Sequence, residues 1–166
     1  MYVTRHHAID ASGTETVVRE LRDRLEVIDA LYRFALGSDL QDRDLFLSAF
    51  TVDGEFDFRP AAAKCGLDIP LMSGRDTIAD IILNPDIPLD TTHVVTNVRV
   101  EVADDHARLT AHVEAQHLPK GDHTRHALLK NLYDVDLVRD GRRWLMRRAC
   151  IDNVWFTGDP KVIIGL

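Results

Sequence analysis

The stretch "TTHVVTNVRVEV", residues 91–102, decides the fold because it alternates as a β-strand does along its whole length. One face is rich in valine: Val94, Thr96, Val98, Val100 and Val102. The opposite face begins with a histidine: His93, Val95, Asn97, Arg99 and Glu101. A histidine at the start of a half-apolar strand predicts an imidazole at the mouth of a pocket, where it could accept a proton.

The facing of His93 is ambiguous, because the valine-rich face looks the more buried of the two. Either a β-bulge reverses the facing partway along the strand, or both faces are buried. We favour the second interpretation, in which Val94, Val98 and Val102 pack against another subunit. The strand therefore predicts a homo-oligomer, since an apolar sheet face of this size would be a liability in water.

Composition limits the classes of protein that fit. The chain has 166 residues, of which 45% are hydrophobic and 28% charged, as expected for one soluble domain. A net charge of −7 disfavours nucleic acid as a partner. No apolar run approaches the ~20 residues of a membrane span, and the first residues lack the apolar centre of a signal peptide, so we expect a cytoplasmic protein without a membrane partner.

Cysteine and histidine spacing argues against a metal site. Cys65 and Cys150 lie far apart and outside any CxxC pattern, which disfavours both a disulfide framework and zinc. The eight histidines show no HExxH or similar spacing. We therefore expect no metal.

Helices are predicted upstream of this strand. Apolar residues recur at three- and four-residue steps over 15–36, which indicates a long amphipathic helix that Gly37 ends. We then expect a short helix over 42–50 and a short strand over 54–60. A loop over 61–74 contains an edge strand at 69–72, and a third helix over 74–83 is capped by Ser73.

Strands dominate the rest of the chain. Four alternating stretches are joined by short turns: 91–103, 106–118, 125–139 and 143–157. Helices followed by an antiparallel meander are typical of α+β proteins, in which helices cover one face of a curved sheet. The expected organisation is a flexible N-terminal tail, a single domain, and a C-terminal tail or lid: 1–14, 15–157 and 158–166.

Two of these strands predict a ligand cavity. The apolar face of 106–118 carries small side chains and ends in a histidine: Ala107, Leu109, Ala111, Val113, Ala115 and His117. In 125–139, Asn131 and Tyr133 share a face with Leu129, Val135 and Leu137, so both polar groups should point inward. A single inward polar group is usually hydrogen-bonded to backbone, but several that converge in an apolar lining are typical of a small-molecule site.

Three segments together resemble one family. They are "LYRFALGSDLQDRDLFLSAFTVDGEFDF" (31–58), "THVVTNVRVE" (92–101) and "RDGRRWLMRRACIDNVWFT" (139–157). Over about residues 16–157, their order and spacing resemble the SnoaL-like families of the nuclear transport factor 2-like superfold, of the scytalone dehydratase and hexachlorocyclohexane dehydrochlorinase type. The resemblance implies a cone-shaped, curved antiparallel or mixed sheet wrapped around the N-terminal helices, and a dimer or trimer formed through the sheet.

The resemblance also implies site residues. In the lyases of this group an aspartate at the end of the first helix orients a histidine on the strand, and by position these are Asp39 and His93. A second catalytic histidine corresponds to His117, and an amide or hydroxyl on the next strand corresponds to Asn131. Scytalone dehydratase has tyrosines where this chain has Ser38 and Phe58. Tyr32 and Tyr133 could supply a phenol from other positions, so the predicted substrate-binding side chains are Asn131, Tyr133, Tyr32 and Phe58.

These residues imply a cofactor-independent lyase or isomerase that removes a proton from a small, mostly apolar cyclic molecule. A polyketide-cyclase-type enzyme and a non-catalytic ligand-binding or oxygenase small-subunit-like scaffold remain open. A pocket with Asp39 and His93 within hydrogen-bond distance favours the enzyme, whereas a pocket filled by Phe58 and Trp144 favours the scaffold. Epoxide hydrolysis would need an Asp-Arg-Asp set that the inward positions do not supply.

Overall fold

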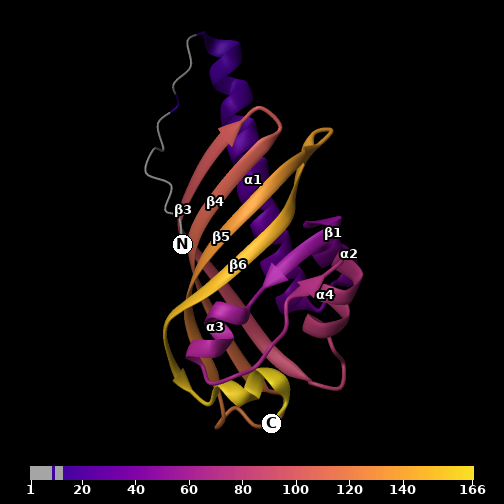
Figure 1. Ribbon diagram of the computed structural model, residues 1–166, viewed down its shortest axis with the longest axis vertical. Helices are drawn as coiled ribbons and strands as arrows, with labels where there is room; N and C mark the ends of the chain where they lie inside the picture. Colours follow the sequence, from indigo (N-terminus) through magenta and orange to yellow (C-terminus); the bar gives the residue numbers. More distant parts are fainter. Residues whose placement is uncertain (1–8, 10–12) are drawn as a thin grey trace.

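A computed structural model describes residue 9 and residues 13–166, and these fold as α+β with helices packed on one face of a mixed sheet (Figure 1). The predicted fold class is confirmed. In chain order the elements are α1 (Thr14–Leu40), α2 (Arg43–Leu47), β1 (Phe50–Asp57), α3 (Arg59–Lys64), β2 (Met72–Ser73), α4 (Arg75–Ile82), β3 (Leu89–Ala103), β4 (His106–Pro119), β5 (Ala127–Asp140), β6 (Arg143–Gly158) and the 3₁₀ helix η1 (Pro160–Ile164).

The described strands form one unclosed sheet in the order β2-β1-β6-β5-β4-β3. All neighbours are antiparallel except β1 and β6, which are parallel. The long α1 lies behind the curved sheet and packs against β3 and β6 (Figure 1). Most of the predicted 1–14 tail lies outside the described residues.

The first helix is longer than predicted. Gly37 does not end α1, which continues to Leu40 and is closed by Gln41 in the left-handed region (φ 55°). A Cβ on Gly37 would lie 2.5 Å from the backbone nitrogen of Phe46, so the glycine is needed because α2 crosses the helix at that point. The extra turn places Asp39 inside α1, facing the start of β3.

Three other local predictions were wrong. The loop predicted over 61–74 contains most of α3, because Pro60 occupies the first turn of a helix, where its missing N–H costs nothing. Ser73 lies in β2, and α4 begins after Gly74 without a side-chain cap. The short strand starts at Phe50 instead of residue 54. The four long strands are confirmed, with ends that differ by one or two residues.

A β-bulge in β3 settles the facing of His93. Thr96 pairs with His112 and Arg99 with Thr110, so β3 has one extra residue, and Asn97 there adopts a left-handed φ of 53°. The first of the two interpretations is therefore the one observed: the bulge reverses the facing, so the valines do not share one face along the strand. Val94 is 51% exposed, whereas Val100 is fully buried.

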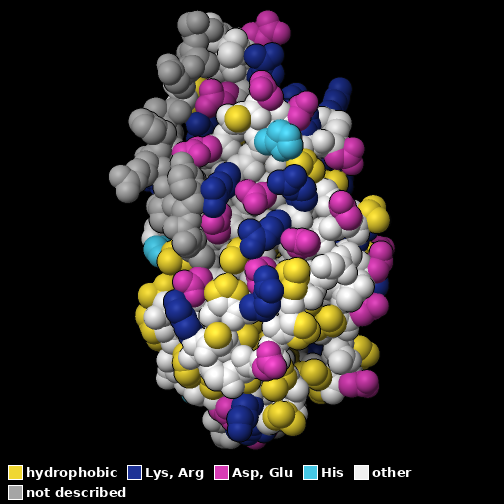
Figure 2. Space-filling model, viewed as in Figure 1, with side chains coloured by type: hydrophobic (Ala, Val, Ile, Leu, Met, Phe, Trp, Pro, Cys, Tyr) yellow, Lys and Arg dark blue, Asp and Glu magenta, His cyan; other side chains and the backbone are white. Residues whose placement is uncertain are grey.

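The outer face of the sheet mixes charges of both signs, as Figure 2 shows for the side of the molecule that Figure 1 presents. Arg108 pairs with Asp134, and Lys130 pairs with Glu114 across neighbouring strands. The homo-oligomer stays a prediction, and the continuous valine stripe that suggested it is absent from the described strand. No helix in the described part of the chain has the length and apolar character needed to cross a membrane.

The bulge predicts a specific pattern of stability. Asn97→Val should destabilise the protein by about 1–2 kcal/mol, because a β-branched residue is strained at positive φ. Asn97→Gly is the matched control: it also removes the contact of the Asn97 amide with the His112 ring, yet tolerates this φ. Urea unfolding of both variants measures the difference, and equal stability would contradict the bulge.

Candidate active site

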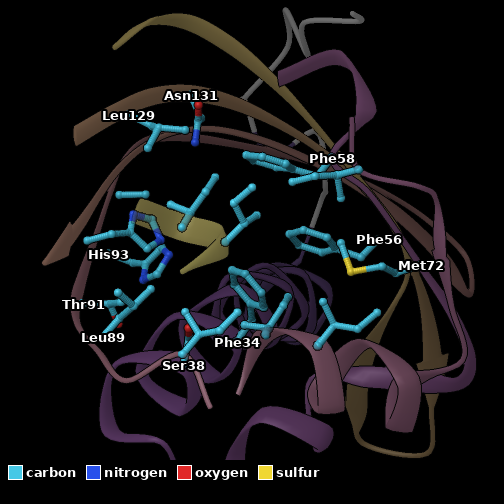
Figure 3. A pocket seen from close by; sticks show the side chains of 18 of the residues that line it. Phe34, Ser38, Phe56, Phe58, Met72, Leu89, Thr91, His93, Leu129 and Asn131 are labelled. Atoms are coloured by element: carbon cyan, nitrogen blue, oxygen red, sulfur yellow. The ribbon is translucent and has the colours of Figure 1, made fainter. Parts of the chain in front are cut away.

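A cavity of about 190 Å³ lies between the inner face of the sheet, the C-terminal half of α1, and η1. Most of its lining is aliphatic or aromatic, with Phe34, Phe56, Phe58 and Met72 on one side (Figure 3). The polar side chains that reach it are few: Ser38, Gln41, Thr91, His93, His117 and Asn131, with the phenol of Tyr133. Ile163 and Ile164 of η1 also line it, so the predicted tail or lid at 158–166 borders the cavity.

The structure brings Asp39 and His93 together. Asp39 Oδ1 lies 2.6 Å from His93 Nδ1, and Asp39 Oδ2 accepts the backbone N–H of His93 at 2.8 Å. The Thr91 hydroxyl donates to Asp39 Oδ1 at 2.9 Å. The side chains of His93 and Asp39 are only 6% and 16% exposed. One carboxylate therefore holds both the ring and the backbone of His93 in place.

These contacts decide the protonation state of Asp39. Burial by itself would raise its pKa, but the hydrogen bonds and charge of His93 and the hydroxyl of Thr91 outweigh burial, so the pKa is lowered from its usual value. Asp39 is therefore a carboxylate at neutral pH. Because a carboxylate only accepts hydrogen bonds, His93 must carry a proton on Nδ1.

His117 reaches the cavity from β4, next to His93. The centroids of the two rings are 5.7 Å apart, and the ring planes are nearly perpendicular, with an angle of 86° between them. Burial, followed by the neighbouring charge of His93, lowers the pKa of His117 to about 3. His117 Nδ1 is buried and has no hydrogen-bond partner among the described residues. At neutral pH His117 is an uncharged ring beside the Asp39–His93 pair.

The inward faces predicted for β4 and β5 are confirmed. Asn131 and Tyr133 are 2% and 3% exposed, and both line the cavity. Burial and the negative charge of Asp39 raise the pKa of Tyr133, so its hydroxyl keeps its proton. Asn131 Oδ1 accepts a hydrogen bond from Asn153 Nδ2 at 2.9 Å.

The two remaining predicted residues differ in outcome. Phe58 lines the cavity, at the junction of β1 and α3. Tyr32 does not: it is 43% exposed on α1 and is absent from the lining, because the helix turns this position away from the sheet. Trp144 is fully buried in the core and does not fill the cavity.

Sequence reasoning missed two residues around the site. Thr91 could have been found, because it lies two positions before His93 and therefore on the same face of the strand. Asn153 could also have been found, because it lies two positions after Ile151 and therefore on the same face of the strand. Within the described residues, no three His, Cys, Asp or Glu side chains gather closely enough to hold a metal ion.

Comparison with solved structures defines the class of fold. A candidate scytalone dehydratase from Novosphingobium aromaticivorans has a TM-score of 0.72 at 16% identity, over 86% of this chain and 91% of that chain. Hexachlorocyclohexane dehydrochlorinase LinA-type3 from Novosphingobium barchaimii has a TM-score of 0.70 at 19% identity, over 86% and 93%. The α+β fold is thus shared with proteins of these two kinds.

Comparison of sequences then gives the family. Residues 19–149 match the SnoaL-like domain. Terrestric acid biosynthesis cluster protein E of Penicillium crustosum is 30% identical over 149 residues, which make up 86% of this chain and 90% of that protein. The chain belongs to the SnoaL-like family, and the resemblance inferred from the sequence is confirmed.

The low pKa of His117 predicts a pH-dependent stability. His117 is neutral when folded and would bind a proton in the unfolded chain below about pH 6.5, so its contribution is complete above that pH and is lost as pH falls toward 3. Between pH 6 and 4, the unfolding free energy of the wild type should therefore fall relative to that of His117→Leu by roughly 1 kcal/mol per pH unit.

Urea titrations at a series of pH values give this difference directly. His112→Gln, at an exposed position on the same strand, is the matched control for the loss of a histidine. His117→Gln shows whether an uncharged polar side chain at this position removes the pH dependence of stability in the same way as leucine. Parallel stability curves for the wild type and His117→Leu would mean that His117 is charged or accessible in the folded protein.

Proposed function

We propose that this protein is a cofactor-independent lyase or isomerase, in which His93 removes a proton from carbon and Asp39 orients and stabilises it. The observation that carries the proposal is the 2.6 Å contact between Asp39 Oδ1 and His93 Nδ1 at the wall of an apolar cavity. Membership of the SnoaL-like family, with dehydratase- and dehydrochlorinase-like structural neighbours, supports this class of reaction.

The proposed base is His93 Nε2. Because Nδ1 holds its proton against Asp39, the neutral ring keeps a lone pair on Nε2. When Nε2 takes a proton from a C–H next to a carbonyl, the ring becomes positive, and the adjacent carboxylate stabilises that charge. The lowered pKa of Asp39 keeps this countercharge available at neutral pH.

Neutral donors would stabilise the other product of that step, the enolate. The Tyr133 hydroxyl, the Asn131 amide and the neutral His117 ring line the cavity and are candidates to donate to the developing oxyanion. Each well-placed donor in a dry site lowers the barrier by about 3 kcal/mol. In a lyase the enolate electrons expel a leaving group from the neighbouring carbon, and the proton held on His93 Nε2 leaves with that group. In an isomerase the same proton returns to another carbon.

The substrate inferred for this site is a small, mostly apolar cyclic molecule. Aromatic and aliphatic side chains form most of the cavity wall, so a ring system would be held by apolar contact and water would be excluded. The Penicillium crustosum relative is named for the biosynthesis of terrestric acid, which supports a substrate from small-molecule biosynthesis. Ring closure by an aldol step would begin with the same deprotonation.

Deuterium exchange tests the proposal without the natural substrate. A panel of cyclic ketones and β-hydroxy ketones in D₂O should show enzyme-catalysed C–H exchange or elimination by proton NMR. His93→Ala and Asp39→Asn should each lower the rate by roughly 10²–10⁴-fold, the usual contribution of a positioned acid or base.

His112→Ala removes an exposed histidine from the outer face of β4 and should keep the wild-type rate. Circular dichroism confirms that each variant is folded. The dyad has no part in catalysis if either site variant retains the wild-type rate. A ligand-binding scaffold is the better description if no panel compound reacts although several bind.

A further inference from the structure

We propose that Asn153, which does not line the cavity, is a positioning residue: it fixes the Asn131 amide so that its NH₂ group faces the cavity. The site then presents a hydrogen-bond donor at this point and takes a substrate that carries an acceptor oxygen there. The substrate half of this inference rests on the proposed function, whereas the orientation of Asn131 does not.

The pairing of β5 with β6 brings the two amides together, next to a bulge. Lys130 pairs with Trp155 and Asn131 with Asn153, so Val154 is an extra residue in β6. Asn153 faces inward beside Asn131 by regular alternation with Ile151, and the insertion turns Trp155, two positions later, outward, where it is 51% exposed. Asn131 and Asn153 are each only 2% exposed, so neither amide can satisfy its polar atoms with bulk water.

Backbone carbonyls decide which way the Asn153 amide points. Its Nδ2 lies 3.1 Å from the carbonyl oxygen of Trp155 and 3.4 Å from that of Lys130. A carbonyl oxygen can only accept a hydrogen bond, so the group that meets these oxygens must be the NH₂ of Asn153. The reverse orientation would place three oxygens against one another in a buried site.

The orientation of Asn131 follows from that of Asn153. The same Asn153 Nδ2 lies 2.9 Å from Asn131, which must therefore present its Oδ1 as the acceptor. The Asn131 NH₂ is then left on the cavity side, and Figure 3 shows its nitrogen directed inward and its oxygen directed toward the sheet. Two main-chain carbonyls thus determine, through one relay residue, that the cavity wall donates at Asn131.

This polarity narrows the substrate class. A donor in an apolar wall favours a carbonyl or developing oxyanion and disfavours a group that can only donate, such as an ammonium. Asn131 lies on β5 and His93 on β3, two strand spacings or about 10 Å apart across the sheet. We infer a ring compound whose acceptor oxygen lies on the β5 side of the ring and is conjugated with the carbon that His93 deprotonates, so that negative charge develops on that oxygen.

Two isosteric variants test the orientation without any ligand. In Asn131→Asp the new carboxylate can still accept from Asn153, and its second oxygen faces the cavity. In Asn153→Asp the carboxylate faces the Trp155 and Lys130 carbonyls, where it has nothing to accept. The melting temperature of Asn153→Asp should therefore be lower than that of Asn131→Asp by roughly 5 °C or more. Equal melting temperatures, or the reverse order, would overturn the relay.

NMR of the side-chain amides separates positioning from a purely structural role. In the ¹⁵N-labelled wild type, the Asn131 NH₂ protons should show nuclear Overhauser effects to side chains that line the cavity. In Asn153→Leu these effects should be lost or strongly weakened while the backbone amide spectrum keeps its folded dispersion. Asn131 signals that are unchanged in this variant would mean that Asn153 does not position the amide.

Neither measurement uses a substrate, so failure of the relay and failure of the lyase proposal are distinguishable. Once a substrate is known, Asn153→Leu should lower kcat more than it raises KM, since a misdirected amide affects the developing oxyanion most. A variant that changes only KM would assign Asn131 to ground-state binding and would overturn the oxyanion part of the inference.

Discussion

The contact between Asp39 and His93 joins the end of α1 to the start of β3, and the arrangement of the site depends on it. It requires α1 to continue one turn past Gly37, which is possible because α2 crosses where the glycine has no side chain. It also requires β3 to begin with His93 facing inward. A carboxylate that binds both the ring and the backbone of the same residue ties two distant segments of chain into one rigid unit.

Bulges determine which side chains reach the cavity. The extra residue at Asn97 allows β3 to direct His93 into the pocket at one end and Val100 into the core at the other. The extra residue at Val154 follows the inward-facing Asn153 and turns Trp155 to the outer surface. In a regular β3, His93 and Val100 would lie on opposite faces, because they are seven residues apart and side chains alternate along a strand.

The groups at the cavity differ in their charge. Asp39 is kept ionised by donors from His93 and Thr91, whereas His117 and Tyr133 are kept neutral by burial. One negative charge beside an ionisable ring, with uncharged donors around it, suits a reaction in which positive charge forms on His93 and negative charge forms on the substrate.

Short-range patterns in the sequence were sufficient to predict much of the fold and of the candidate site. Alternation predicted the four long strands and the inward faces that carry His117, Asn131 and Tyr133, because strand periodicity depends only on neighbouring residues. Similarity to a family indicated Asp39 and His93. Packing between elements decided the rest: the true end of α1, the reversal at Asn97, and the contacts that Thr91 and Asn153 make. Each of these depends on a contact between different elements, to which periodicity within one element is blind.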